Sequence, residues 1–504
     1  MPPASPLTWP DVLVLLLGLG LVLGIGAYFT ARQKDTSDFF LAGRRIPWWA
    51  ACLSFLATEI SALTIVGVPA AAFRENWEYA QFFIGSSAAK LGIAFLFIPA
   101  FYALRVTTIY ELLGHRFGRA TQVTASLFFF LTRLLGSGVR LYAAALAVTI
   151  LLGWSLPTTL VLFTLVSIAY IAAGGVSAIV WTNVLQALAF IAAGVGALLF
   201  VVSSVDGGAA AVWRIAGEAG KLRVIHPSPA PWEPGFLGQA LAGANIWWVA
   251  ILNGFVGSLA AFGTDHDLMQ RLIAVETRQE SQRTVALSIL PTLLVLLLYL
   301  SLGSALYAFY AGHPGLAVGN TDHVLPLFAR DWMPGGLRGL VLTAILLASL
   351  DSPLGALAAS FVTDIYRPHL APGRDEAHYL RVSRVAVLAF GLVLALLAWV
   401  CSYFEGILWV AFKITGVTFG SLLGVFLLAL LTRRPLVDRA NVLAMVLMAL
   451  VNAVLLVLAE KKLIALGWSW LVILGTLGTV GLALGLDALL RRRPGARPGV
   501  PAPP

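Results

Sequence analysis

The sequence predicts an all-α polytopic membrane protein with about thirteen transmembrane helices. Hydrophobic residues make up 59% of its 504 residues and charged residues only 11%, which is too apolar for a soluble protein of this length. Apolar windows of about 20 residues, the length that a helix needs to cross a bilayer, recur along the chain. The basic residues that give the net charge of +9 are scattered between these windows, a pattern of membrane topology and not of nucleic-acid binding.

The expected helices follow one another with mostly short connections. They occupy residues 11–31, 48–73, 78–104, 121–151, 155–173, 178–204, 240–263, 284–311, 337–365, 380–401, 405–432, 440–459 and 466–490. Alternate connections carry 21 of the 33 Lys and Arg residues, so the positive-inside rule predicts a plasma-membrane protein with its N-terminus outside and its C-terminus in the cytoplasm. No basic residue precedes the first window, which favours a spanning helix over a signal peptide.

The longer connections contain no sign of a catalytic domain. Residues 205–239 and 312–336 are rich in Pro and Gly and are predicted to form ordered turns or lids, whereas residues 491–504 form a basic, disordered tail. Cys52 and Cys401 lie inside apolar windows, so we expect buried thiols and neither a disulfide nor a metal site. Because nucleotide-binding, zinc-protease and hydrolase motifs are absent from the sequence, we do not expect an enzyme.

Segment 48–73 is apolar except at its centre. Glu59 lies there among Ser and Thr residues, and a carboxylate at mid-membrane costs at least about 2.5 kcal/mol unless it faces a polar cavity or a partner. Gly67 and Pro69 follow and weaken the helical hydrogen-bond ladder. One interpretation is a discontinuous helix that holds a solute and an ion. The other is a packed helix whose hydroxyls bond to the preceding turn and whose Glu59 pairs with a neighbouring helix.

Six ionisable residues fall within expected spans. They are Glu59, Lys90, Arg133, Arg140, Asp351 and Lys413. Ion pairs inside the protein would explain some of them, but so many charged groups at membrane depth favour a solute pathway. The sequence does not determine which of these groups pair with one another.

Several short phrases occur in a fixed order between residues 38 and 434. They are DFFLAGRRIPWW (38–49), ATEISALT (57–64), GVP (67–69), YELLGHRFG (110–118), GGVSAIVWTNVLQ (174–186), GTDHDLMQR (263–271), SLDS (349–352), DIY (364–366) and GSLLG (420–424). In this order they resemble the sodium/solute symporter family, which includes sodium-coupled sugar, sialic acid, monocarboxylate and multivitamin transporters.

The resemblance implies one transporter domain with a LeuT-type fold of two inverted five-helix repeats. The repeats would cover residues 48–204 and 240–432, with a leading helix at 11–31 and trailing helices within 440–490. Such a protein is expected to carry a small polar organic solute into the cell, with Na⁺ as the coupling ion. In this fold the solute and the ion meet near the midplane, at a broken helix.

The resemblance also implies a sodium site made of oxygen ligands. By motif position they are the carbonyl oxygens of Ala57, Ile60, Ile345 and Ala348 and the hydroxyl of Ser349. The family commonly has two serines where this chain has Ala348 and Ser349, so one hydroxyl is missing and a water or Ser352 would replace it. Sodium binds tightly only where several oxygen ligands are already in position. The missing hydroxyl at Ala348 is therefore expected to lower the affinity of the site for sodium.

A second ion site is left open by the sequence. Some family members place an aspartate after Trp-Thr to bind another sodium, and this chain has Asn183 there. An amide supplies an oxygen without charge, so Asp351 and Ser352 are candidates to complete the site. Asp351 could equally serve as a partner for a basic group.

The solute contacts are also implied by the resemblance. Ser61 and Thr64 hold the positions that receive the carboxylate in sialic acid transporters. Glu59 would repel an anion unless a cation such as Arg133 or Arg140 intervenes, although an arginine could instead clamp a solute carboxylate. For a neutral sugar, Trp77 or Phe82 would cover the ring. The candidate solute-binding residues are Glu59, Ser61, Thr64, Gln81, Arg140, Ser258 and Lys413.

The phrase at 263–271 suggests a gate on the cytoplasmic side. Asp265 and Asp267 with Gln270 and Arg271 could form a carboxylate–arginine latch, although a solvated loop pair is an equal alternative. We expect His266 to be a solvated loop residue. Alternatives to sodium coupling are proton coupling through Glu59 or Asp351 and a membrane sensor with the same fold.

Overall fold

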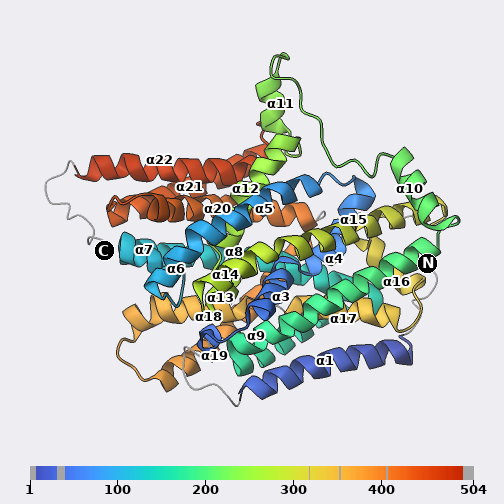
Figure 1. Ribbon diagram of the computed structural model, residues 1–504, viewed down its shortest axis with the longest axis horizontal. Coiled ribbons are helices and arrows are strands. Elements are labelled where there is room, and N and C mark those ends of the chain that lie inside the picture. Colours follow the sequence, from blue (N-terminus) through green and yellow to red (C-terminus); the bar gives the residue numbers. More distant parts are fainter. Residues whose placement is uncertain (1–6, 31–39, 317, 351–352, 405–406, 492–504) are drawn as a thin grey trace.

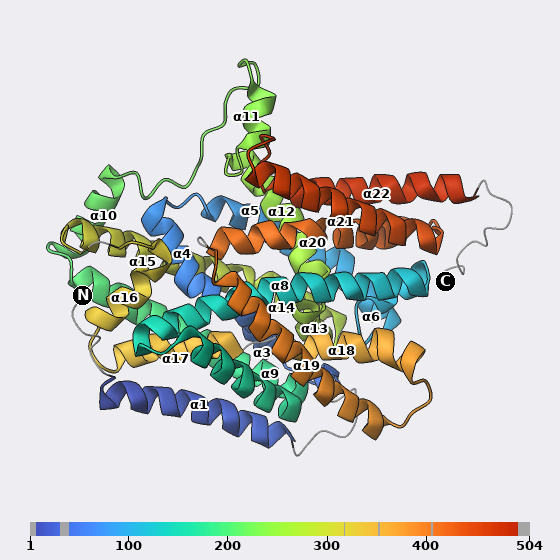
Figure 2. The same ribbon diagram turned by 180° about the vertical axis from the view of Figure 1, so that it is seen from behind.

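Most of the long helices run along the long axis of the molecule in the computed structural model, which describes residues 7–30, 40–316, 318–350, 353–404 and 407–491 (Figure 1). Helix α1 (Trp9–Thr30) lies along one edge of the bundle. Helices α21 (Asp438–Glu460) and α22 (Trp470–Arg491) lie along the opposite edge in both views (Figures 1 and 2). Most of the other helices pack between these two edges, whereas α11 (Phe236–Ala242) projects beyond the edge that α22 forms.

The remaining helices differ widely in length. They are α3 (Trp48–Glu59), α4 (Ala62–Arg74), α5 (Ala80–Gly92), α6 (Ile98–Leu104), α7 (Glu111–Arg116), α8 (Arg119–Leu152), α9 (Leu156–Ser203), α10 (Gly208–Glu218), α11 (Phe236–Ala242), α12 (Trp247–Gly263), α13 (His266–Ile273), α14 (Arg278–Leu287), α15 (Ile289–Ala311), α16 (Val324–Asp331), α17 (Leu337–Leu350), α18 (Leu354–Ser360), α19 (Glu376–Cys401) and α20 (Ile407–Leu431). Short 3₁₀ turns at Ala42–Arg44 and Thr321–His323 and π-helical segments at Ile93–Phe97 and Phe361–Leu370 complete the set. The largest cluster of buried apolar side chains joins α3, α4, α8, α9, α15, α17 and α20.

The expected apolar segments all correspond to helices in the described parts of the chain. Nine helices there are long and apolar enough to cross a bilayer, and the bent pairs α3–α4 and α11–α12 raise the number to eleven. The remaining segments, 155–173 and 337–365, correspond to the shorter apolar helices Leu156–Ile168 and Leu337–Ala348. The first of these is continuous with Val176–Ser203 in α9, so the expected separation between two helices here is not found.

The expected discontinuous helix breaks between α3 and α4. The two helix axes differ by 54°, and Ile60 and Ser61 between them have extended backbones. The Ser61 side chain accepts a hydrogen bond from the amide of Leu63 (3.3 Å), which is an N-cap that starts α4. In the described structure, the carbonyls of Ala57 and Ile60 accept no backbone hydrogen bond.

The position of the break corrects the expectation drawn from Gly67 and Pro69. Both residues lie inside α4, which continues without interruption to Arg74. A Cβ at Gly67 would lie 3.3 Å from the Cβ of Leu408, so the glycine allows α20 to pack closely on α4. The helix therefore breaks at its polar residues and not at its glycine and proline.

A buried ion pair joins the leading helix α1 to α17. Asp11 is fully buried, and one of its carboxylate oxygens lies 2.6 Å from the guanidinium of Arg338. The other oxygen accepts hydrogen bonds from the amides of Gly336 (3.0 Å) and Gly339 (2.7 Å). Asp11 thus satisfies the free amides at the beginning of α17, which normally need a cap. The contact fixes α1 against the bundle.

Candidate functional site

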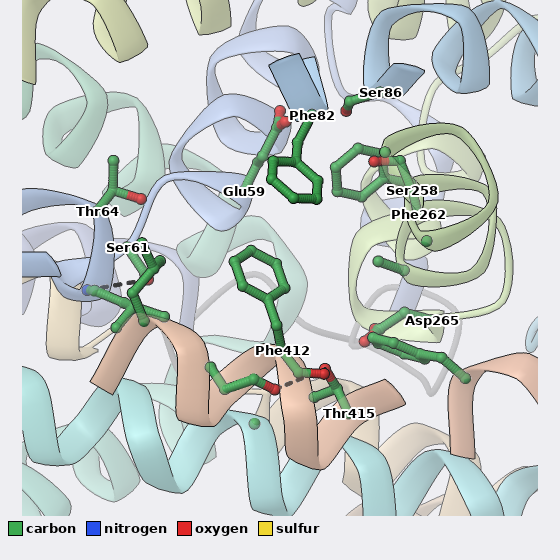
Figure 3. A pocket seen from close by; sticks show the side chains of 18 of the residues that line it. Glu59, Ser61, Thr64, Phe82, Ser86, Ser258, Phe262, Asp265, Phe412 and Thr415 are labelled. Carbon is green, nitrogen blue, oxygen red and sulfur yellow. Dashed lines mark hydrogen bonds between the residues drawn. The ribbon is translucent and has the colours of Figure 1, made fainter. Parts of the chain in front are cut away.

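A cavity of about 240 Å³ lies beside the break between α3 and α4 (Figure 3). Residues from both helices of the broken pair line it, together with residues from α5, α8, α12, α15 and α20. Much of its wall is aromatic, which suits the hydrophobic faces of a small organic solute. The aromatic lining residues are Tyr79, Phe82, Phe83, Phe262, Phe412, Phe419 and Trp468.

Polar groups from the break face this cavity. Ser61 and Thr64 line it at the beginning of α4, where the helix dipole places partial positive charge. Arg140 of α8 also lines the cavity, and its guanidinium donates a hydrogen bond to the carbonyl of Thr58 (2.9 Å). This carbonyl lies in the last turn of α3, where a cation stabilises the unpaired end of a helix. The break therefore offers hydroxyl and cationic groups to the same space.

Glu59, the last residue of α3, also lines the cavity and has a lysine as its partner. One of its carboxylate oxygens, Oε2, lies 2.7 Å from Nζ of Lys90 on α5. The hydroxyl of Thr292 on α15 lies 3.0 Å from both groups. The sequence had suggested Arg133, Arg140 or Lys413 for this role; the pairing with Lys90 connects residues that are 31 positions apart.

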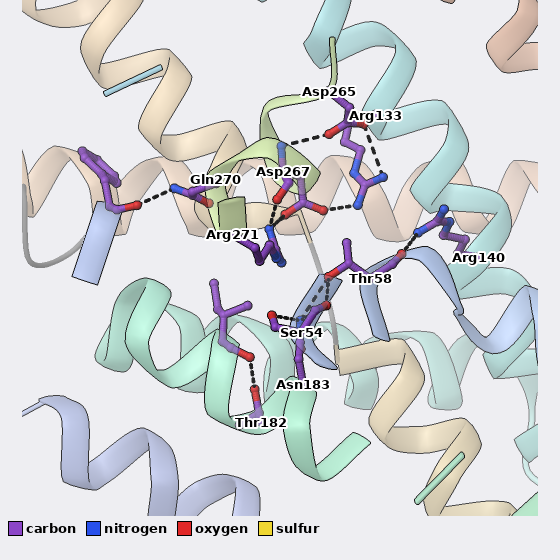
Figure 4. Close-up of polar contacts among 12 residues, drawn as sticks. Ser54, Thr58, Arg133, Arg140, Thr182, Asn183, Asp265, Asp267, Gln270 and Arg271 are labelled. Atoms are coloured by element: carbon purple, nitrogen blue, oxygen red, sulfur yellow. Dashed lines mark hydrogen bonds and ion pairs between the residues drawn. The ribbon is translucent and has the colours of Figure 1, made fainter. Parts of the chain in front are cut away.

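A second network of charges borders the cavity through Arg133 and Asp265 (Figure 4). Arg133 of α8 contacts Asp265 (3.4 Å) and Asp267, and Asp267 also pairs with Arg271. All four side chains are at least nine-tenths buried, so the solvated-loop alternative is wrong. Burial opposes ionisation of Asp267, but the two arginines lower its pKa to about 2. We call this cluster the floor network.

The neighbours of the floor network are buried as well. Gln270 donates a hydrogen bond to the carbonyl of Phe40 (2.8 Å). His266 is fully buried between the rings of Tyr110 and Phe129, which corrects its expected exposure to solvent. Burial lowers the pKa of His266 to about 3, so its imidazole is neutral at physiological pH.

The structure brings together five of the seven candidate solute-binding residues. Glu59, Ser61, Thr64, Arg140 and Ser258 line the cavity, but Gln81 and Lys413 do not. The Gln81 amide donates to the carbonyls of Glu78 (2.9 Å) and Asn245 (3.1 Å) and accepts from the amide of His226 (3.0 Å). It therefore holds His226 and Asn245, which lie in the loops before and after α11, in place.

Two other expected contacts also lie elsewhere. Lys413 pairs with Glu460 of α21 at 2.7 Å, and about a third of its side chain is exposed. Trp77 donates a hydrogen bond from its indole to Ser304 (2.8 Å) and does not line the cavity, whereas Phe82 does. Glu460 and Ser304 are distant in sequence from Lys413 and Trp77, so the spacing of residues along one helix does not predict these contacts.

The cavity also includes residues that the sequence did not single out. Ser86 lies on α5 four residues before Lys90, a spacing that puts both on one helix face. Asn253 lies on α12 five residues before Ser258. The spacing of four residues between Ser86 and the buried Lys90 could have identified Ser86 as a candidate site residue from the sequence.

The residues of the expected ion sites are only partly described. Ile345 and Ala348 are buried in α17. Ser349 belongs to the same helix, but its side chain, like all of Asp351 and Ser352, lies outside the described structure. The Asn183 amide donates hydrogen bonds to the hydroxyls of Ser54 and Thr58, both at 3.1 Å (Figure 4).

Asn183 thereby bridges α9 to α3. Its Oδ1 oxygen is buried and has no hydrogen-bond partner among the described residues. An unpaired buried acceptor is costly, and this oxygen is the only atom of the Asn183 amide group that is left over for an ion.

Known proteins resemble the chain over most of its length. The family model described as the sodium:solute symporter family matches residues 39–446. The sodium/sialic acid symporter SiaT of Proteus mirabilis is 30% identical over 431 residues, which cover 84% of each chain. The sodium/sialic acid symporter NanT of Aliivibrio fischeri is 29% identical over 93% of this chain and 91% of its own length.

A solved structure supports the same relationship. The substrate-bound, outward-open structure of a Na⁺-coupled sialic acid symporter superimposes with a TM-score of 0.85 and 25% identity, covering 96% of this chain and 98% of the other. The expected LeuT-type fold, the role of Na⁺ as coupling ion and the absence of an enzymatic role agree with these matches. The chain belongs to the sodium:solute symporter family.

Proposed function

We propose that this symporter imports a small organic solute that bears a carboxylate group, together with sodium. The observation that carries the proposal is the meeting of Ser61, Thr64 and Arg140 at one cavity, beside the beginning of α4. The end of a broken helix with free donors stabilises an anionic group. The relatives named as sialic acid symporters support a carboxylate-bearing solute.

The sodium ion is proposed to bind on the other side of the break. The carbonyls of Ala57 and Ile60 accept no backbone hydrogen bond in the described structure, which leaves them available as ligands. Ile345 and Ala348 of α17, with the hydroxyl of Ser349, would complete an all-oxygen set of the kind that a hard cation prefers. A second ion would use Asn183 with Asp351 and Ser352.

We infer the orientation of the chain in the membrane from the distribution of its basic residues. We place the N-terminus outside and the C-terminus in the cytoplasm, in the plasma membrane, with the floor network on the cytoplasmic side. Each sodium that enters gains about 2.3 kcal/mol per 100 mV of membrane potential. This energy would drive accumulation of the solute.

The proposal is tested by melting temperatures of the purified protein with a set of carboxylic acids, measured in sodium and in potassium at equal ionic strength. A ligand at 100 times its Kd stabilises the folded state by about 2.7 kcal/mol, so a carboxylate solute should raise the melting temperature, and more strongly in sodium. The double variant Ser61→Ala/Thr64→Ala should lose this shift. Ser203→Ala, at an exposed serine outside the cavity, should retain it; equal shifts for acids and their uncharged amides would contradict the proposal.

A further inference from the structure

Only one of the two carboxylate oxygens of Glu59 is hydrogen-bonded by the described residues of the protein. Oε2 is engaged by Lys90 and Thr292. The structure gives Oε1 no hydrogen bond with any described residue, although Glu59 lines the cavity and is 13% exposed. Carboxylate oxygens only accept hydrogen bonds. A solute in this cavity therefore meets an acceptor that lacks a donor.

Lys90 acts on the cavity only through Glu59. Its side chain is fully buried, and its ammonium lies 5.7 Å and 5.5 Å from the ring centres of Phe55 and Phe262. Lys90 does not line the cavity, whereas Glu59 does. A buried ammonium needs a paired charge, and the contact between Lys90 and Glu59 supplies it and fixes the position of the carboxylate.

Two further polar groups complete this wall of the cavity. Ser86 of α5 and Ser258 of α12 line it together with Glu59, and all three are labelled in the close-up (Figure 3). No hydrogen bond of either hydroxyl is recorded with the described residues, and a hydroxyl can both donate and accept. The wall thus combines one obligate acceptor with two adaptable groups, whereas Ser61 and Thr64 at the beginning of α4 offer donors to an anion.

We propose that Glu59 determines the specificity of transport by accepting a hydrogen bond from a hydroxyl group of the solute. The solute is a hydroxylated carboxylic acid, with its carboxylate at Ser61 and Thr64 and a hydroxyl at Oε1 of Glu59. This inference rests on the proposed function, which supplies the position of the carboxylate. It adds the requirement for a hydrogen-bond donor on another part of the solute, within reach of Glu59.

The charge balance decides between a hydroxyl and an ammonium as that donor. Because Lys90 already neutralises Glu59, an ammonium of the solute would add a second cation beside a buried one. A hydroxyl adds no charge. An acid with no donor would leave Oε1 desolvated and unpaired, and sites built to bind a hydroxyl reject the analogue that lacks it.

The test compares acids of equal length in sodium by thermal shift. The probes are gluconate, hexanoate and 6-aminohexanoate, which share six carbons and differ in hydroxyl and amino groups; sialic acid is added as a larger hydroxylated acid. We expect the wild-type protein to bind at least one hydroxylated acid roughly 10- to 100-fold more tightly than hexanoate and 6-aminohexanoate.

The variants assign this preference to Glu59. Glu59→Leu removes the acceptor and should lower the preference to less than about threefold while hexanoate binding persists. If the single variant does not fold because Lys90 is left without its carboxylate, the double variant Glu59→Leu/Lys90→Met removes both charges and the acceptor and should show the same loss. Lys413→Met changes a paired lysine outside the cavity and should keep the preference.

The outcomes separate the two proposals. A preference that survives in the folded double variant, while Ser61→Ala weakens all the acids alike, overturns the role of Glu59 and leaves the proposed function in place. A wild-type protein that binds hexanoate as tightly as the hydroxylated acids also overturns it. If no carboxylic acid binds to the wild-type protein in sodium, the proposed function fails and the inference fails with it.

Discussion

Replacing Arg133 by leucine should open the floor of the cavity. Arg133 connects α8 to the turn between α12 and α13, where it contacts Asp265 and Asp267. Asp265 lines the cavity, and its side chain is only 1% exposed. We expect that a movement admitting water at this part of the cavity separates these groups. The floor network therefore stabilises the closed floor relative to the open one.

The size of the effect follows from the burial of the network. Removing one partner of a buried ion pair costs about 3–5 kcal/mol, because the other charge is left without compensation. Asp267 retains Arg271 as a partner, so we use the lower value of about 3 kcal/mol. This free energy destabilises the closed state alone, because water solvates Asp265 when the floor is open. A shift of about 3 kcal/mol changes the ratio of the two states by roughly two orders of magnitude.

Cysteine labelling measures this shift. Ala261 lines the cavity, and an Ala261→Cys variant in a background with Cys52 and Cys401 replaced provides a single reactive thiol. A membrane-impermeant maleimide should label it up to about 100-fold faster from the cytoplasmic side in Arg133→Leu. Arg367→Leu, which breaks an exposed ion pair with Glu376, should change the rate little.

The labelling also needs a check that the protein is folded. Arg133→Leu should still show sodium-dependent thermal stabilisation, because the proposed sodium ligands lie elsewhere. If the folded variant is labelled from the cytoplasmic side at the wild-type rate, the floor network does not hold the floor closed and the reasoning is refuted.

Three further predictions follow from the positions of single residues. Asp11→Asn should lower the stability by about 3 kcal/mol, seen as a lower melting temperature, because Arg338 loses its buried partner; an unchanged melting temperature would show that the pair contributes little. Ala348→Ser adds the hydroxyl that the family commonly has and should lower the sodium concentration for half-maximal uptake severalfold, whereas no change would place the ion elsewhere. Lys413→Met should leave the affinity for solute within about twofold in binding assays, because Lys413 pairs with Glu460 outside the cavity; a tenfold loss would restore Lys413 to the site.

The spanning helices were predictable because hydropathy is a local property. Each apolar window becomes a helix that satisfies its own backbone, as lipid requires. The break between α3 and α4 was predicted for a partly wrong reason. Gly67 and Pro69 lie inside the continuous helix α4, and the backbone leaves the helical conformation at Ile60 and Ser61. Ser61 competes for the backbone as an N-cap, and that signal was present in the sequence.

The partners of the charged residues were not predictable. Glu59 and Lys90 are 31 positions apart, and Arg133 and Asp267 are 134 apart. Hydropathy and helix spacing say that such groups need partners, but the choice depends on which helices are neighbours in three dimensions. The same argument applies to Gln81, whose amide bonds to Asn245 and His226 instead of lining the cavity.

Helix α8 connects the two ends of the site. Arg133 and Arg140 are seven residues apart, close to two helical turns, so both side chains leave the same face of α8. Arg140 holds the Thr58 carbonyl at the end of α3, and Arg133 holds Asp267 beyond the end of α12. A displacement of α8 relative to α3 and α12 would therefore strain two contacts. One is the contact of Arg140 beside the proposed carboxylate position, and the other is the contact of Arg133 in the floor network. A solute that strengthens the first contact biases the second through one continuous helix, which is the kind of shared element that coupling between sites requires.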